Sequence, residues 1–293
     1  MNPPYANLAQ AREYLALASQ NTDDDAVLLS FLNRASRSID RYCRRPFFPK
    51  RETRTYDYKM SDRIKLDAEL LKLDTLTTEN GGETIGQSIL IFQTGENYNY
   101  GPWDTITIRS DSGSLLNFSA TEQQANSVTG FWGYHEDYAN AWVDTGTSLA
   151  GSYAASATSL SLAGAGSAGV GASDVNFEAP RISPGDLLWV EGEMFLAVGG
   201  AGNNNATVIP HFSGTSSNDH ASGVAVYKFT PEPDINFATL RLTSWMYGQR
   251  MSPYESKTAF VQLGTVSIPS SWATDIRDKI DRYKRTTLVI YPD

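Results

Sequence analysis

Cysteine is nearly absent from this 293-residue chain, in which Cys43 stands alone. No disulfide can therefore form within the chain, and a single thiol fits a protein made in a reducing cytoplasm. Cys43 falls on the apolar side of a predicted helix with no histidine beside it in sequence, so we expect a small core residue rather than a nucleophile.

Long apolar runs are also missing. No stretch approaches the ~20 apolar residues that a membrane-spanning helix needs. The first residues, MNPPYANLAQAREYLALA, lack the basic segment followed by an apolar segment that marks a secretory signal. We therefore expect no membrane anchor.

Histidine is scarce, and its spacing excludes the common metal and catalytic motifs. His135 is followed directly by Glu136 and Asp137, whereas His211 and His220 lie far downstream. A metalloprotease-type HExxH pattern is absent, and three adjacent polar residues are typical of a turn. The many carboxylates of the middle region could supply a glycosidase pair, but no two of them stand out. We expect no metal, no cofactor and no enzymatic activity.

One glycine pattern resembles a nucleotide-binding motif. GAGSAG, residues 164–169, matches the G-x-G-x-x-G spacing. That motif binds dinucleotides only between a strand and a helix, and the residues that follow contain further glycine and a proline without a helical apolar face. The composition of residues 146–173 predicts a loop or linker, with TSLSL as a short strand.

Charge divides the chain into three parts. Residues 1–60 carry 10 basic and 7 acidic side chains, residues 61–230 carry 6 and 19, and residues 231–293 carry 8 and 7. The net charges are +3, −13 and +1, which sum to −9. The ends resemble each other and differ from the middle, so we predict one module from residues 1–60 and 231–293 and a β-rich insertion over residues 61–230.

Secondary-structure patterns agree with that division. Helical periodicity predicts helices over residues 7–18, capped by Asn7, and from about Asp24 to Cys43. Further helices are predicted after Asp234 and after Ser270 or Ser271. Residues 63–78 fit a helix or a strand, while ILIF, TITIR, VTGFWGY and GVAVYKF are typical of strands. The predicted fold class is α+β.

The second predicted helix concentrates arginine in an acidic chain. On that helix, Arg34, Arg37, Arg41 and Arg44 fall within a narrow arc opposite the apolar face, and Arg45 follows. A solvated helix face and a protein interface, where arginine pairs with carboxylates, both fit this pattern. Contact with nucleic-acid phosphates fits it less well, because the chain is acidic and has no other basic patch with interleaved aromatic residues.

Both chain ends resemble head–tail connector (adaptor) proteins of tailed bacteriophages. Residues 5–49, YANLAQAREYLALASQNTDDDAVLLSFLNRASRSIDRYCRRPFFP, are similar to the N-terminal helical hairpin of that family, and DINFATLRLTSWMYGQRMSP to its C-terminal helix. FWGY, GDLLWVEGEMFLAVGG and residues 207–229 resemble an inserted β region of larger adaptors. The matching positions there are Gly185, Glu193, Gly214, Thr215, His220, Gly223 and Val226, whereas Pro210-His211 replaces the usual Arg-Gly.

The resemblance implies a structural protein of the virion neck, made in the host cytoplasm. Such adaptors form a ring, commonly twelve-fold, that docks under the portal protein, contacts tail or further neck proteins and extends the DNA channel without sequence-specific binding. The family carries no catalytic residues. By this analogy we expect the arginines to face a neighbouring subunit or the portal. We expect the β-prone tail residues Leu288, Val289, Ile290 and Tyr291 to reach a neighbouring protein, although pairing within the chain fits the tail equally well.

A second function class also fits the sequence. A β module on a helical anchor in the tail could bind carbohydrate or host surfaces, using tryptophans as stacking platforms. The alternative to stacking is burial in the core, which we favour. The tryptophans concerned are Trp103, Trp132, Trp142 and Trp189.

Overall fold

The computed structural model describes residues 2–17, 22–95, 101–164, 182–200, 205–251, 257–260, 264–267 and 274–285. They form helices and strands, so the α+β class predicted from the sequence is confirmed. The chain divides into two compact units. Unit 1 comprises Met1–Arg45, Val143–Phe212 and Ser216–Asp293, and unit 2 comprises Pro46–Trp142 and Ser213–Thr215.

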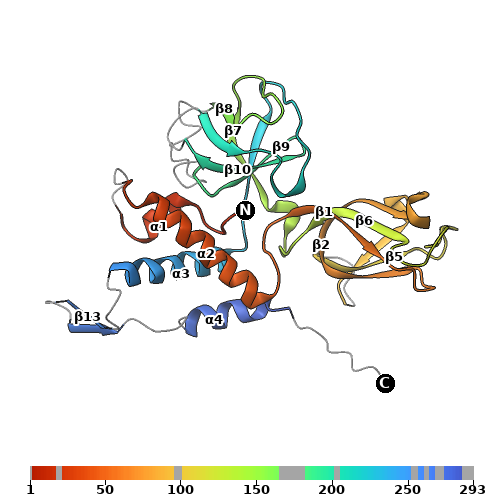
Figure 1. The fold of residues 1–293 in the computed structure, drawn as a ribbon, viewed down its shortest axis with the longest axis horizontal. Helices are drawn as coiled ribbons and strands as arrows, with labels where there is room; N and C mark the ends of the chain where they lie inside the picture. The colour runs from red at the N-terminus through yellow and green to blue at the C-terminus, as the bar shows by residue number, and fades with distance from the viewer. Residues whose placement is uncertain are drawn as a thin grey trace. The chain divides into compact units, whose positions relative to one another are not determined.

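Four helices of unit 1 come from both ends of the chain (Figure 1). Helix α2 packs against α3, α1 contacts both of them, and α4 contacts α3. Ala11 of α1, Leu32 of α2 and Leu240 of α3 belong to one apolar cluster. The helices are α1 (Leu8–Tyr14), α2 (Asp25–Cys43), α3 (Pro233–Met251) and α4 (Thr274–Ile280).

The first helix begins where the sequence predicts and ends earlier. Asn7 is the N-cap: its side chain accepts the backbone N–H of Gln10, whose side chain accepts the N–H of Asn7 in return. The predicted range of 7–18 is too long, because Ala16 adopts a left-handed conformation with φ of 52°. The N–H groups of Ala16 and Leu17 then satisfy the carbonyls of Glu13 and Arg12, which ends the helix at Tyr14.

Six strands of unit 1 form a closed barrel in the order β10-β11-β8-β7-β12-β9. Its interior is filled by apolar side chains, among them Leu160, Leu188, Phe195, Val208 and Val226. The strands are β7 (Trp142–Leu149), β8 (Ser159–Gly164), β9 (Leu187–Val190), β10 (Glu193–Gly199), β11 (Asn205–Ile209) and β12 (Ala225–Phe229).

The predicted loop over residues 146–173 therefore holds more strand than expected. Strand β7 extends to Leu149 within it, and β8 includes the last four residues of the predicted TSLSL strand. The first glycine of the GAGSAG stretch, Gly164, ends β8, and the rest of that stretch lies outside the described residues.

A loop of the barrel covers the start of α1. The side-chain amide of Asn7 donates to Asp186 (Nδ2–Oδ1 3.0 Å), and the N–H of Leu8 donates to the carbonyl of Pro184 at 2.9 Å. Gly185 has φ of +104°, and a Cβ there would lie 3.1 Å from Pro4 Cγ. Burial raises the pKa of Asp186, against the favourable charge of Lys228. The N-terminal segment and the barrel therefore fold as parts of one unit.

Unit 2 is an antiparallel sheet in the order β1-β6-β2-β5-β4, with β3 paired to β2. Its core includes Leu70, Leu76, Ile106, Val128 and Trp132. Figure 1 labels four of its strands. The strands are β1 (Lys50–Tyr56), β2 (Arg63–Thr78), β3 (Glu83–Ile85), β4 (Leu90–Gln93), β5 (Trp103–Ile108) and β6 (Asn126–Trp132).

Short elements complete the described residues. Single turns of 3-10 helix are Glu79–Gly81, Gln87–Ile89, Tyr138–Asn140, Phe212–Gly214 and Asp281–Tyr283. An antiparallel hairpin lies between α3 and α4, in a segment for which no element was predicted. Its strands are β13 (Lys257–Phe260) and β14 (Gly264–Ser267).

The observed division differs from the predicted domains. Strand β1 pairs along its whole length with β6, so residues 46–60 belong to the sheet unit rather than to the helices. The barrel groups with the helices in unit 1, so the predicted insertion over residues 61–230 is split between two units. Net charge could not reveal this, because the sheet and the barrel are both acidic.

Candidate protein interface

The arginines of α2 line one side of that helix, but they differ in environment. Arg34 and Arg41 are exposed, whereas Arg37 between them is half-buried. Arg44 lies beyond the helix in a left-handed conformation (φ 58°), and its N–H donates to the carbonyl of Asp40. The predicted arc of Arg34, Arg37, Arg41 and Arg44 therefore includes one residue that follows the last helical residue, Cys43.

Arg37 is engaged within its own unit. Its guanidinium forms an ion pair with Asp40, donates to the carbonyl oxygen of Pro3 at 2.7 Å, and lies 5.4 Å from the ring centre of Tyr5. Tyr5 is fully buried. Its hydroxyl donates a hydrogen bond to Asp40, and its backbone N–H donates to the Ser36 hydroxyl at 3.0 Å. Arg37 therefore fastens the N-terminal segment to α2.

Asp40 is the acidic centre of this arrangement. Burial raises its pKa to about 6, although Arg37 and the hydroxyl of Tyr5 favour the charged form. Its side chain is 18% exposed, which agrees with a dominant desolvation effect.

Arg34 and Arg41 border an open hollow of about 320 Å³ between α2 and α3. Neither guanidinium forms an ion pair or a side-chain hydrogen bond with the residues that the structure describes. Met246 of α3 supplies an apolar side chain to the same hollow. The lining residues, which we call the arginine hollow, are Asn33, Arg34, Arg37, Ser38, Arg41 and Met246.

Helix α3 is apolar on more than one side, because Phe237 and Leu240 lie roughly opposite Ile235 and Leu242 at about 100° per residue. Ile235, Ala238 and Leu242 are buried, but Trp245 and Met246 remain half-exposed. A helix that is apolar around much of its circumference is typical of one covered on several sides. The arginine hollow therefore adjoins a helix surface suited to a further contact.

The remaining predicted interface residues are not among the residues that line the hollow. Arg44 and Arg45 follow the last turn of α2 and are not among its lining residues. Leu288, Val289, Ile290 and Tyr291 lie outside the described residues, so the predicted role of the tail stays a prediction.

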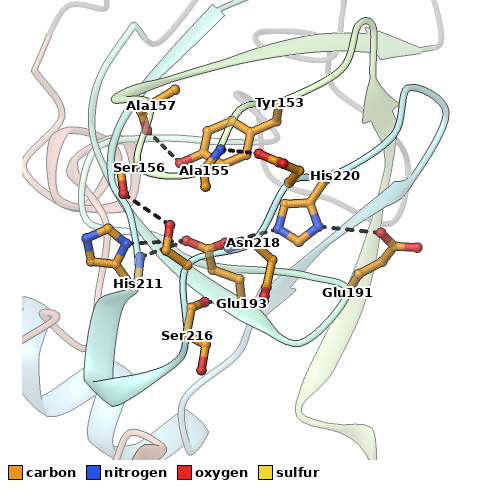
Figure 2. Close-up of polar contacts among 12 residues, drawn as sticks. Tyr153, Ala155, Ser156, Ala157, Glu191, Glu193, His211, Ser216, Asn218 and His220 are labelled. Carbon is orange, nitrogen blue, oxygen red and sulfur yellow. Dashed lines mark hydrogen bonds and ion pairs between the residues drawn. The ribbon is translucent and has the colours of Figure 1, made fainter.

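A second polar cluster lies in the barrel, and Figure 2 shows how its side chains converge. Glu193 is fully buried. Its two carboxylate oxygens accept the backbone N–H groups of His211 and Asn218, each at 2.9 Å. The buried His220 places Nε2 3.1 Å from Glu193 and Nδ1 3.4 Å from Glu191. Its ring stacks on Tyr153, with 5.7 Å between centres.

The Glu193 cluster holds the loop that follows β11 against the barrel. Its hydrogen bonds tie residues 211–220 to β10, and they use both carboxylate oxygens of a side chain that water does not reach. Glu193 and His220 each match the connector pattern in sequence, but the pattern does not indicate that the two side chains meet. The available signal was a glutamate inside the apolar strand sequence EMFLAV.

Two other residues considered in the sequence, His135 and Cys43, are buried. His135 is buried, and its Nδ1 accepts the N–H of Asp137 at 3.1 Å, which confirms the predicted turn. Cys43 is buried as predicted, and burial raises the pKa of its thiol to about 12, so the nucleophilic thiolate is disfavoured. Within the described ranges, no three His, Cys, Asp or Glu side chains converge in a way that could hold a metal ion.

Two of the four tryptophans pack against neighbouring side chains of the sheet unit. Trp132 is buried, donates from Nε1 to the carbonyl of Glu52 at 3.0 Å and lies under the guanidinium of Arg54. Trp103 packs on Phe92 with 6.1 Å between ring centres. Trp103, Trp142 and Trp189 are half-buried.

No described helix is both long and apolar enough to cross a bilayer. Protein-family models gave no match to the chain, and curated protein sequences gave none either.

Proposed function

We propose that this chain is a structural protein of the phage virion, a head-to-tail adaptor. In this proposal it forms a ring, twelve-fold by analogy, beneath the portal and extends the DNA channel toward the tail. It acts by assembly rather than by catalysis.

The arginine hollow carries the proposal. Arg34 and Arg41 remain without ion pairs among the described residues of a chain with net charge −9, and they line the hollow together with a half-exposed apolar side chain of α3. Arginine beside an exposed methionine is typical of a protein interface, where both residue types are enriched. Helices from both chain ends also pack together, as the resemblance to connector proteins implies.

In this proposal the helices α1–α4 are the connector module, and the sheet and barrel are additions within the chain. An acidic composition suits a DNA conduit, because negative walls repel phosphates and let the genome pass without binding. Heterologous contacts between identical subunits close into a ring when the rotation between them permits.

Symmetry-averaged imaging of virions tests the proposal. We expect density for this chain as a closed ring between the portal and the tail, with the arginine hollow at a contact with another chain. Placement in tail fibres, or trimers that bind glycans through Trp103, Trp142 or Trp189, would instead support the carbohydrate-binding alternative.

A further inference from the structure

We propose that the arginine hollow binds an acidic helix of a different protein, one with two carboxylates seven residues apart and an apolar residue between them. The binding chemistry follows from the geometry of α2 and α3. Identifying the partner as the portal or another neck protein rests on the proposed function.

The spacing of the two exposed arginines defines the ligand. Arg34 and Arg41 are seven residues apart on one helix, which places them on the same side and about 10 Å apart along its axis. A helix lying along the groove would present carboxylates seven residues apart at the same separation. Each guanidinium can then receive a carboxylate through two parallel hydrogen bonds.

The apolar part of the lining favours a protein ligand over nucleic acid. Met246 lies beside the arginines, and a flexible thioether packs well against an aliphatic side chain. A phosphate backbone offers no apolar group for that position. The third arginine of the hollow is also less available to a phosphate, because Arg37 is already paired with Asp40.

The described helices of this chain do not carry the matching pattern. The acidic residues of α2 are Asp25 and Asp40, α1 has only Glu13, and α3 has only Asp234. The two aspartates of α4, at positions 275 and 278, are three residues apart. The proposed ligand is therefore a helix of another protein rather than these helices in a second copy.

Synthetic helices of about 20 residues provide the probe. One fluorescent peptide carries two glutamates seven residues apart with a leucine midway. A second carries glutamine at both positions, and a third has the glutamates five residues apart. Anisotropy titrations with the full chain at low salt should show binding of the first peptide, with about tenfold weaker binding of the other two.

Variants of the chain locate the binding. Arg34→Glu and Arg41→Glu should each weaken binding about tenfold, as should Met246→Ala. Met246→Leu keeps an apolar side chain of similar volume and should bind like the parent chain. Arg63→Glu is the matched control, because Arg63 is an exposed arginine of unit 2. Circular dichroism checks that each variant is folded.

Three outcomes would overturn the proposal. The first is no binding of the glutamate peptide at about 1 mM, an affinity weaker than about −4 kcal/mol. The second is equal binding of the glutamate and glutamine peptides. The third is preferential binding of a duplex DNA probe that Arg34→Glu and Arg41→Glu abolish, which would assign the hollow to phosphates. Peptide binding by a chain that imaging places outside the neck would refute the proposed function and leave the docking site standing.

Discussion

At the scale of single residues, three arginines on one side of α2 have two different roles. Arg37 contacts Asp40, Pro3 and Tyr5 of its own unit, whereas Arg34 and Arg41 line the arginine hollow without an ion pair to the described residues. Helical spacing predicted their common side correctly but could not separate the roles. The deciding partners, Pro3 and Tyr5, come from a segment about thirty residues away that only the folded chain brings to α2.

Charge reversal should expose this difference. Arg37→Glu places a second carboxylate beside Asp40 and removes the bond to Pro3, so we expect a loss of about 2 kcal/mol in the free energy of unfolding. Arg34→Glu and Arg41→Glu should each stay within about 0.5 kcal/mol, because both side chains are exposed. Urea unfolding at pH 7 measures all three, and equal losses would contradict the assignment.

The pKa of Asp40 predicts how stability depends on pH. The carboxyl titrates near 3.8 when unfolded and at about 6 when folded, so the folded state binds this proton more tightly. Its contribution is fully present below pH 3.8 and is lost as pH rises through 6. The pKa difference corresponds to at most about 3 kcal/mol, and residual solvent around the side chain reduces that figure.

Asp40→Asn isolates this effect. The variant should lack the decline in unfolding free energy between about pH 4 and pH 7 that the parent chain shows. Asp111→Asn serves as the control, because Asp111 is exposed and its hydrogen bond with Arg109 lowers its pKa. Identical pH profiles for the parent chain and Asp40→Asn would rule out a raised pKa at this position.

At the scale of elements, the Glu193 cluster holds the loop after β11 to the barrel. Glu193→Ala would leave the N–H groups of His211 and Asn218 without their acceptor, at a cost of about 2–4 kcal/mol. Glu193→Gln keeps one acceptor oxygen and should lose roughly half as much. Thermal unfolding measures both losses, and equal stability of the alanine variant and the parent would show that water replaces the carboxylate.

Strands were predictable where short β-prone runs lie between turn residues, and β4, β5 and β6 lie close to their predicted positions. The pattern failed for β2, where helix and strand both fitted. Its pairing register shifts between Lys65 and Leu70 and again between Leu70 and Lys72. Such bulges interrupt alternation, so the two-residue period is lost even though the segment is extended.

The start of α1 could be predicted from neighbouring residues, but its contact with the barrel could not. Asn7 was predictable as an N-cap because capping depends on neighbouring residues. Its second contact, with Asp186, spans 179 positions and leaves no local trace. Sequence therefore located the helix start but not the barrel loop that covers it.

At the scale of the whole molecule, the sequence predicted the arginines of the candidate surface but not the contribution of α3 to the same hollow. Met246 looked like an ordinary apolar residue of a predicted helix, and only the packing of α3 on α2 brings it to Arg34 and Arg41. The domain prediction relied on net charge, which does not distinguish an acidic sheet from an acidic barrel.

The C-terminal tail allows a prediction about assembly. The N–H of Arg285 donates to the carbonyl of Cys43 at 2.9 Å, so the chain is fastened to the end of α2 just before the tail starts. Deleting residues 287–293 should therefore leave the free energy of unfolding unchanged within about 0.5 kcal/mol. If the tail reaches a neighbouring protein, filled heads should lose their necks or leak DNA. A destabilised chain that still assembles would show that the tail pairs within its own fold.

The burial of Cys43 has a practical consequence for watching this molecule assemble. The only thiol of the chain is enclosed, and its raised pKa keeps it protonated at neutral pH. Maleimide dyes react with exposed thiolates, so the parent chain should remain unlabelled while it is folded. A cysteine introduced by Ser38→Cys would then carry the only dye, beside the arginine hollow. Its fluorescence would report each docking event in real time.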